Sequence, residues 1–230
     1  MGLKLPVFTV GLRFTRPVAG GNPVSTNLIA DYIAALESGQ SNPVKAAIAT
    51  DGVATEESII KFLEGCTGLH YRDNDGPYIC DYMIAANLRA AAIALNIRGA
   101  KTGALYNVLT QGLMMPPRVH LNNDQESEFI TRAIQPFDKG YRNPTLARFE
   151  VIPAGAEITF PLVVADDKEL NRERLKELFS WGGTIGLGSK RKLGYGKYEL
   201  IRLSNGKQIG MDSIATITEG NSEKELIEVI

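Results

Sequence analysis

The sequence has few of the features that would place the protein outside the reducing interior of a cell. Its two cysteines, Cys66 and Cys80, are too few for a disulfide framework. No apolar run is long enough to span a bilayer, and the first residues lack the apolar segment of a secretion signal. Gly2 fits an N-myristoylation signal, but Pro6 and the strand-like residues after it argue against one. We therefore expect a soluble, cytoplasmic protein without a membrane partner.

The sequence also lacks an overall charge. Its 25 Lys and Arg residues nearly balance 26 Asp and Glu residues, which gives a net charge of −1. No global field therefore attracts nucleic acid, and any such binding must use a local patch. Repeats, low-complexity tracts and linkers are missing too. With 230 residues and 44% hydrophobic content, the chain can bury a full core.

The most distinctive stretch that is present runs from Trp181 to Tyr198. Six of its eighteen residues are glycine, and three consecutive cations lie between two glycine pairs. Glycine allows tight backbone folding, and three cations at a loop tip suit the phosphates of a nucleic acid. Phosphate-binding loops of NTPases and dinucleotide-binding fingerprints place their glycines before a helix, whereas here a helical pattern comes first. The alternative to a phosphate-binding loop is a structural turn with solvated lysines, but such a turn does not explain three adjacent cations. The glycines and cations concerned are Gly186, Gly188, Lys190, Arg191, Lys192, Gly194 and Gly196.

The rest of the chain mixes strand and helix patterns without regular βαβ alternation, which favours an α+β fold with a largely antiparallel sheet. Residues 104–111 fit helix or strand, residues 114–121 an edge strand or an extended loop, and residues 129–134 remain ambiguous. Pro153-Ala154-Gly155 has the right size for a hairpin turn between two strands. We expect strands over 7–14, 146–152, 156–164 and 195–203, a short hairpin over 68–79, and helices over 27–38, 55–65, 81–97 and 167–180.

Candidates for acid–base chemistry are sparse. His70 lies close in sequence to Tyr71, Asp73 and Asp75, and a metal-independent ribonuclease needs a base, an acid and a cation near the phosphate. Turn chemistry alone explains both aspartates, however, and His120 fits a surface histidine. We leave the catalytic residues unassigned and lean against an enzyme.

A zinc site built on Cys66, His70 and Cys80 would need His120 or a carboxylate as its fourth ligand, and the spacing matches no familiar zinc site. We expect two inert cysteines, no metal and no cofactor. The remaining cations are scattered. Among them, Lys139 and Arg142 lie in a loop that contains glycine and proline, and they are the better candidates for phosphate contact. Tyr141 or Tyr195 is a candidate for stacking on a base, although Tyr195 fits a core position equally well.

Three stretches together resemble the RAMP superfamily, the repeat-associated RNA-binding proteins of CRISPR systems. GLGSKRKLGYGKY is similar to the family's C-terminal glycine-rich motif. LHYRDNDGPYICDYMIAANLRAAA resembles its short hairpin followed by a helix that ends in an arginine, here Arg89. RNPTLARFEVIPAGAEITF resembles a charged strand, an E-x-x-P-A-G turn and the next strand. Family members often carry a Lys-Gly pair where this chain has Ala85-Ala86.

The resemblance implies a ferredoxin-like, RRM-related antiparallel sheet with helices on one side, in a single domain over 1–230. An insertion over about 17–65 and a C-terminal extension over about 206–230 would be added to that core.

The resemblance further implies contacts with guide or repeat RNA and assembly with copies of the chain or related subunits. Some family members are backbone subunits, and some of these cut a target RNA with an aspartate in a loop. Asp124 is the candidate for that aspartate here. Other family members are metal-independent endoribonucleases that process repeat RNA. We expect a non-catalytic RNA-binding subunit, with an endoribonuclease or a scaffold or inhibitor without RNA binding as alternatives. The expected RNA contacts are the glycine-rich stretch above, Arg142, Lys139, Arg89 and Arg16.

Overall fold

The computed structural model describes residues 4–23, 25, 29, 30, 33, 55–122, 126–134, 145–204 and 207–218. These residues form a mixed α+β fold with three antiparallel sheets and five α-helices. The loop positions Asp124, Lys139, Tyr141 and Arg142, and most of the helix expected over 27–38, lie outside the described residues. No described helix has the length and apolar character needed to cross a membrane.

The main sheet has the strand order β10-β1-β9-β5, all antiparallel, and β11 pairs with the first residues of β1. The four strands come in the chain order β1, β5, β9, β10; α4 and α5 precede β5, and α6 lies between β9 and β10. This is the ferredoxin-like arrangement, so the predicted fold class is confirmed. The elements are β1 (Lys4–Phe14), β5 (Leu113–Met114), β9 (Glu157–Val164), β10 (Tyr198–Leu203) and β11 (Lys207–Gly210).

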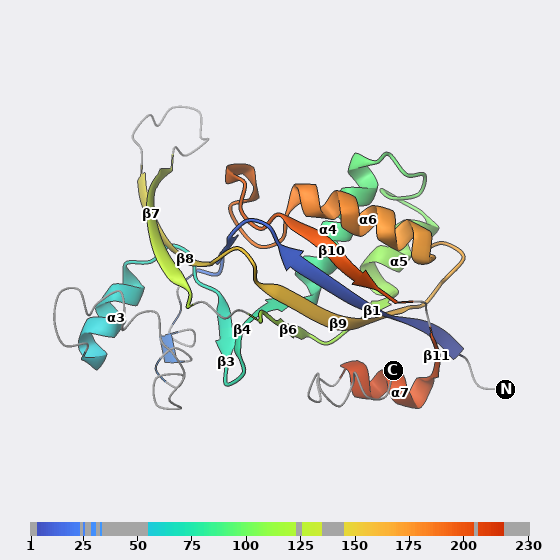
Figure 1. Ribbon diagram of the computed structural model, residues 1–230, viewed down its shortest axis with the longest axis horizontal. Helices are drawn as coiled ribbons and strands as arrows, with labels where there is room; N and C mark the ends of the chain where they lie inside the picture. The colour runs from blue at the N-terminus through green and yellow to red at the C-terminus, as the bar shows by residue number, and fades with distance from the viewer. Residues whose placement is uncertain are drawn as a thin grey trace.

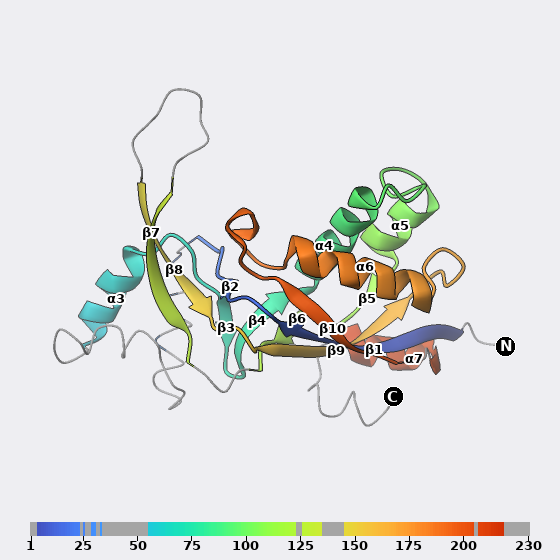
Figure 2. The same cartoon turned by 45° about the horizontal axis from the view of Figure 1, so that its top comes forward.

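Helices α4 (Asp81–Ala94), α5 (Ala104–Gln111) and α6 (Arg172–Ile185) lie over one face of this sheet, as Figures 1 and 2 show. The segment over 104–111 that fitted helix or strand is thus helical. Helix α7 (Met211–Thr218) packs on the opposite face at one end of the sheet.

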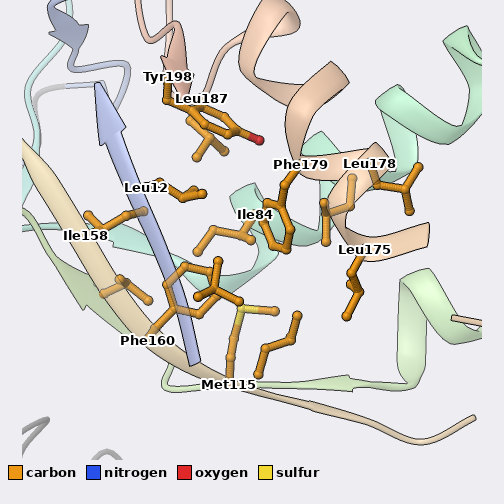
Figure 3. Close-up of a cluster of buried hydrophobic side chains, with 14 of the residues drawn as sticks. Leu12, Ile84, Met115, Ile158, Phe160, Leu175, Leu178, Phe179, Leu187 and Tyr198 are labelled. Atoms are coloured by element: carbon orange, nitrogen blue, oxygen red, sulfur yellow. The ribbon is translucent and has the colours of Figure 1, made fainter. Parts of the chain in front are cut away.

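Strand β1 packs on one face against the main core and, over its first residues, on the other face against α7. Val10, Leu12 and Phe14 belong to the main core between the sheet and helices α4 and α6, whereas Leu5 and Val7 pack with residues of α7. Figure 3 shows the main core, in which Phe160 of β9 packs edge-on against Phe179 of α6. Each such side chain contributes about 1.5–3 kcal/mol by leaving water.

A second sheet, β2-β8-β7, consists of β2 (Val18–Ala19), β8 (Thr145–Ile152) and β7 (Glu128–Ile134). The ambiguous segment over 129–134 is therefore strand. The hairpin predicted between residues 146–152 and 156–164 is wrong, because β8 pairs with β2 and β7 while β9 pairs with β1. The turn at Pro153–Gly155 carries the chain from one sheet to the other, and the Gly155 N–H donates to the Phe14 carbonyl at 2.8 Å. Helix α3 (Glu56–Glu64) lies near this sheet, and Phe62 of α3 packs edge-on against Phe129 of β7.

The third sheet, β3-β4-β6, contains the predicted short hairpin, β3 (Tyr71–Asp73) and β4 (Gly76–Cys80), and adds β6 (Arg118–His120). Ile79 and Val119 face inward and join the main core. Long helix α4 follows directly after β4, so its first turn lies next to this sheet.

Candidate nucleic-acid interface

Helix α6 extends further than the sequence predicted. It continues through Trp181, Gly182 and Gly183 to Ile185, so the first part of the glycine-rich stretch is helix rather than loop. The reason is close packing: a Cβ on Gly183 would collide with the Tyr198 carbonyl, and one on Gly182 with the Asn87 side chain. These two glycines let α6 approach β10 and α4, which offsets their low helix propensity.

The segment from Gly186 to Gly196, hereafter the glycine loop, is held at its base by backbone hydrogen bonds. Leu187 N–H donates to the Gly196 carbonyl at 2.8 Å, Gly196 N–H to the Pro17 carbonyl at 2.7 Å, and Ser189 N–H to the Ala19 carbonyl at 3.0 Å. At the crossing point Gly196 has φ +69°, and a Cβ there would collide with the Leu187 carbonyl. The tip is a short 3₁₀ turn, Arg191–Leu193.

Asn87 of α4 anchors the start of the glycine loop from behind. Its amide nitrogen donates to the carbonyls of Gly182 at 3.1 Å and Gly186 at 2.9 Å, and its amide oxygen accepts from the Tyr198 hydroxyl at 2.6 Å. Burial raises the pKa of Tyr198 strongly, which keeps this hydroxyl a donor. Asn87 was not among the predicted site residues, and its signal in the sequence is a polar side chain within an otherwise apolar helix.

The tip of the glycine loop borders a cleft of about 860 Å³. In Figures 1 and 2 the loop stands as an orange-red segment between α6 and the β7–β8 pair. Arg191 and Lys192 are exposed, and Lys190 is half-buried with its Nζ 5.7 Å from the centre of the Phe149 ring. Three of the predicted phosphate ligands are therefore brought together at one rim. The cleft is lined by Val18, Ala19, Gly21, Asn22, His70, Tyr78, Ile79, Tyr82, Met83, Ala133 and Gly188–Leu193.

His70 lies at the base of the cleft and is 4% exposed. Its Nε2 is 3.0 Å from the Val18 carbonyl, and its backbone N–H donates to Glu150 at 2.9 Å. Burial lowers the pKa of His70, which favours the neutral ring with Nε2 as the donor to that carbonyl. These contacts give His70 a structural position and do not connect it to the aspartates of the neighbouring turn.

Asp73 instead pairs with His120. The Asp73 Oδ1 lies 2.9 Å from His120 Nε2, and its Oδ2 lies 3.0 Å from Arg118 Nη1. Burial works to raise the pKa of Asp73, but hydrogen bonds from His120, Arg118 and the Asp75 N–H outweigh it and leave the pKa lowered. The sequence grouped His70 with Asp73, whereas the structure pairs Asp73 with His120 and holds His70 in a separate, buried environment.

Behind the cleft, Glu150 and Arg72 form a buried ion pair. Their side chains are 0% and 7% exposed, and Arg72 Nη2 lies 2.8 Å from Glu150 Oε1. Ser127 donates a further hydrogen bond to the same oxygen at 2.7 Å. This pair links β3 to β8 and was not foreseen; its signal was a glutamate between the apolar residues Phe149 and Val151.

The two other predicted cations that the structure describes, Arg89 and Arg16, do not line this cleft. Arg89 borders a separate cavity of about 270 Å³, where its guanidinium lies 4.7 Å from the centre of the Tyr106 ring. Arg16 is exposed near the base of the glycine loop, and its backbone N–H donates to the Lys197 carbonyl at 3.2 Å. Tyr195 is a core residue, 5% exposed and packed edge-on against Phe149.

The two cysteines do not form a metal site with His70. Among the described residues, the acidic, histidine and cysteine side chains close enough to share an ion are Asp73, Asp75 and His120. Cys66 and Cys80 are free thiols, and burial raises the pKa of Cys66 to about 11, as expected for an inert cysteine.

No family model matches the chain, and no curated protein matches its sequence. Among solved structures, the chain is similar to one chain of the cryo-EM structure of the Type III-B Cmr-beta bound to cognate target RNA. The two chains share 13% identity with a TM-score of 0.50, over 90% of this chain and 61% of that one. This chain therefore spans about three fifths of its neighbour's length, and at this identity the similarity shows a shared fold.

Proposed function

We propose that this protein is an RNA-binding subunit of a CRISPR-type ribonucleoprotein, of the RAMP superfamily and of the backbone-subunit type. The observation that supports this best is the glycine loop, which is fixed at its base and presents Lys190, Arg191 and Lys192 at the rim of a cleft. The three motifs and the structural neighbour, a chain from a complex bound to target RNA, support the same function.

The loop suits a polyanion for two physical reasons. Its base is already ordered by backbone hydrogen bonds, so RNA binding loses little conformational entropy in the loop. Its cations are local, which gives a chain of net charge −1 a positive site without a global field.

The test replaces Lys190, Arg191 and Lys192 together with alanine and measures binding to single-stranded RNA across salt concentrations. Three lost phosphate contacts should make the log–log salt dependence shallower by about 2, because each contact contributes about 0.7 on a single strand. The matched control replaces Arg98, Lys101 and Lys176, which are exposed and lie outside the cleft, and should leave the slope unchanged. An unaltered slope in the first variant would refute the role of the loop.

We further propose that residues 1–230 act as one cytoplasmic domain that assembles along RNA with copies of itself or with related subunits. Native mass spectrometry of the protein with RNA of increasing length should then show a stepwise rise in bound copies. A constant single copy per RNA would contradict self-assembly. If purified protein neither carries nor binds RNA, the scaffold or inhibitor alternative replaces this proposal.

A second candidate, a metal-independent endoribonuclease, is favoured by the cluster of Asp73, His120 and Arg118. In such a reaction a base takes the proton of a 2′-hydroxyl, the oxygen attacks the adjacent phosphorus, and the 5′-oxygen leaves with a proton from an acid. Incubation with labelled repeat RNA in EDTA decides between the candidates. Site-specific product ending in a cyclic phosphate, lost in His120→Ala and kept in His70→Gln, would support the enzyme.

A further inference from the structure

The third sheet carries aromatic rings on its outward side. Strand alternation sends Ile79 and Val119 into the core and leaves Tyr71, Tyr78 and His120 outward. The Tyr71 and Tyr78 rings are nearly parallel, at 16° with centroids 5.8 Å apart, and His120 lies 5.8 Å from Tyr78 on its other side. We call the outward side formed by these three residues the aromatic face.

Tyr82 extends the aromatic face to the cleft. It lies in the first turn of α4, directly after β4, with the thiol of Cys80 nearby. Despite this neighbour the side chain is 57% exposed. Tyr78 and Tyr82 both line the cleft that the tip of the glycine loop borders.

Packing explains only part of this arrangement. Cross-strand aromatic pairs stabilise sheets, which accounts for Tyr71 and Tyr78. It does not account for Tyr82, which has more than half of its surface in solvent and, among the residues that the structure describes, stacks on no other ring. Arg118 already lies 5.3 Å from the centre of the Tyr78 ring, so Tyr82 is the more accessible of the two rings at the cleft.

We propose that Tyr82, supported by Tyr78, forms a stacking subsite for an unpaired nucleobase, and this proposal rests on the proposed RNA-binding function. Sites for single strands combine cations that neutralise phosphates with rings on which bases stack. This cleft has the cations on the loop side and the rings on the sheet side. Because every base has a π-face, the subsite accepts any base and excludes a duplex, whose bases are already stacked.

The test compares two single-stranded oligonucleotides of equal length and charge, one of uridines and one of abasic ribose phosphates. Stacking one base is worth about 1–3 kcal/mol, so the wild-type protein should prefer the uridine strand by about 5- to 150-fold. Tyr82→Leu should lose most of this preference while keeping the salt dependence of the wild type. Tyr82→Phe keeps the ring and should keep the preference.

Trp181→Leu is the matched control, because Trp181 is an aromatic residue 43% exposed on α6 that does not line the cleft. It should leave both affinities unchanged. Equal wild-type affinity for the two strands would overturn the stacking subsite and leave the proposed function standing. A shallower salt dependence in Tyr82→Leu would also overturn the subsite, because the substitution would then act through the loop. Absence of binding to either strand would remove the subsite together with the proposed function.

Discussion

The two walls of the cleft are built by different means. The glycine loop is fixed at its base by backbone hydrogen bonds, by Asn87 and by the buried side chains of Leu187 and Tyr195. The third sheet is fixed from behind by apolar side chains and the buried pair Arg72–Glu150. The loop should therefore be sensitive to added atoms at its base, and the sheet to removed charges behind it. Both walls should tolerate changes on the surfaces that face the cleft.

The largest effect is expected on the sheet wall, from Glu150→Ala. This substitution leaves the Arg72 guanidinium buried without its carboxylate and should lower the free energy of unfolding by about 3–5 kcal/mol. Urea denaturation monitored by circular dichroism measures it. The double variant Arg72→Met with Glu150→Leu should recover a large part of the loss, since an apolar pair can replace a buried ion pair. Equal destabilisation by the single and double variants would show that the ion pair is not the anchor.

On the loop wall, two glycines of the same loop give a matched comparison. Gly196→Ala adds a methyl group against the Leu187 carbonyl at a φ of +69° and should cost about 3 kcal/mol or displace the loop. Gly194→Ala meets no atom within 4 Å and has only the backbone cost of its φ of +88°, about 1 kcal/mol. Thermal unfolding of both variants checks the order. If Gly194→Ala proved the more harmful, the crossing at Gly196 would not be what fixes the loop.

The smallest effect is the pH dependence from Asp73 on the surface of the sheet wall. Its pKa is lowered in the folded protein, so the unfolded state binds the proton more readily near pH 4. Its contribution to stability is present above the unfolded pKa of about 3.9 and is lost as the pH falls through the lower folded value. Asp73→Asn should flatten the acid side of the stability profile, and His120→Ala should raise the pKa of Asp73 in an NMR titration. An unchanged Asp73 titration in His120→Ala would contradict the pairing.

The sequence predicted the elements whose patterns are local. Strand β1, the β3–β4 hairpin and helix α4 follow from alternation, turn residues and apolar content, and the resemblance added the ferredoxin-like order. The predicted hairpin at Pro153–Gly155 was wrong because the same turn residues can also carry the chain from one sheet to another. Only the pairing of β8 with β2 distinguishes the two cases. Trp181–Gly183 was predicted as loop because glycine disfavours helix, whereas close packing on Tyr198 requires glycine within the helix.

The site could be predicted in part for the same reason. The run of cations at 190–192 is visible in the sequence, and its exposure follows from the loop that carries it. Asn87, Glu150 and Tyr82 become informative only when strands and helices distant in sequence meet. The aromatic face also depends on β6, which pairs with β4 from about forty residues further along the chain.

Strand β1 has a consequence for how the protein is made. Its partners are β9, β10 and β11, and the Thr9 N–H donates to the hydroxyl of Ser204, 195 residues away. An apolar strand of eleven residues therefore emerges from the ribosome long before its neighbours are translated. Until then its edges and apolar faces are open to other chains, so newly synthesised protein should need a chaperone at this segment, and truncated products that end before residue 157 should aggregate.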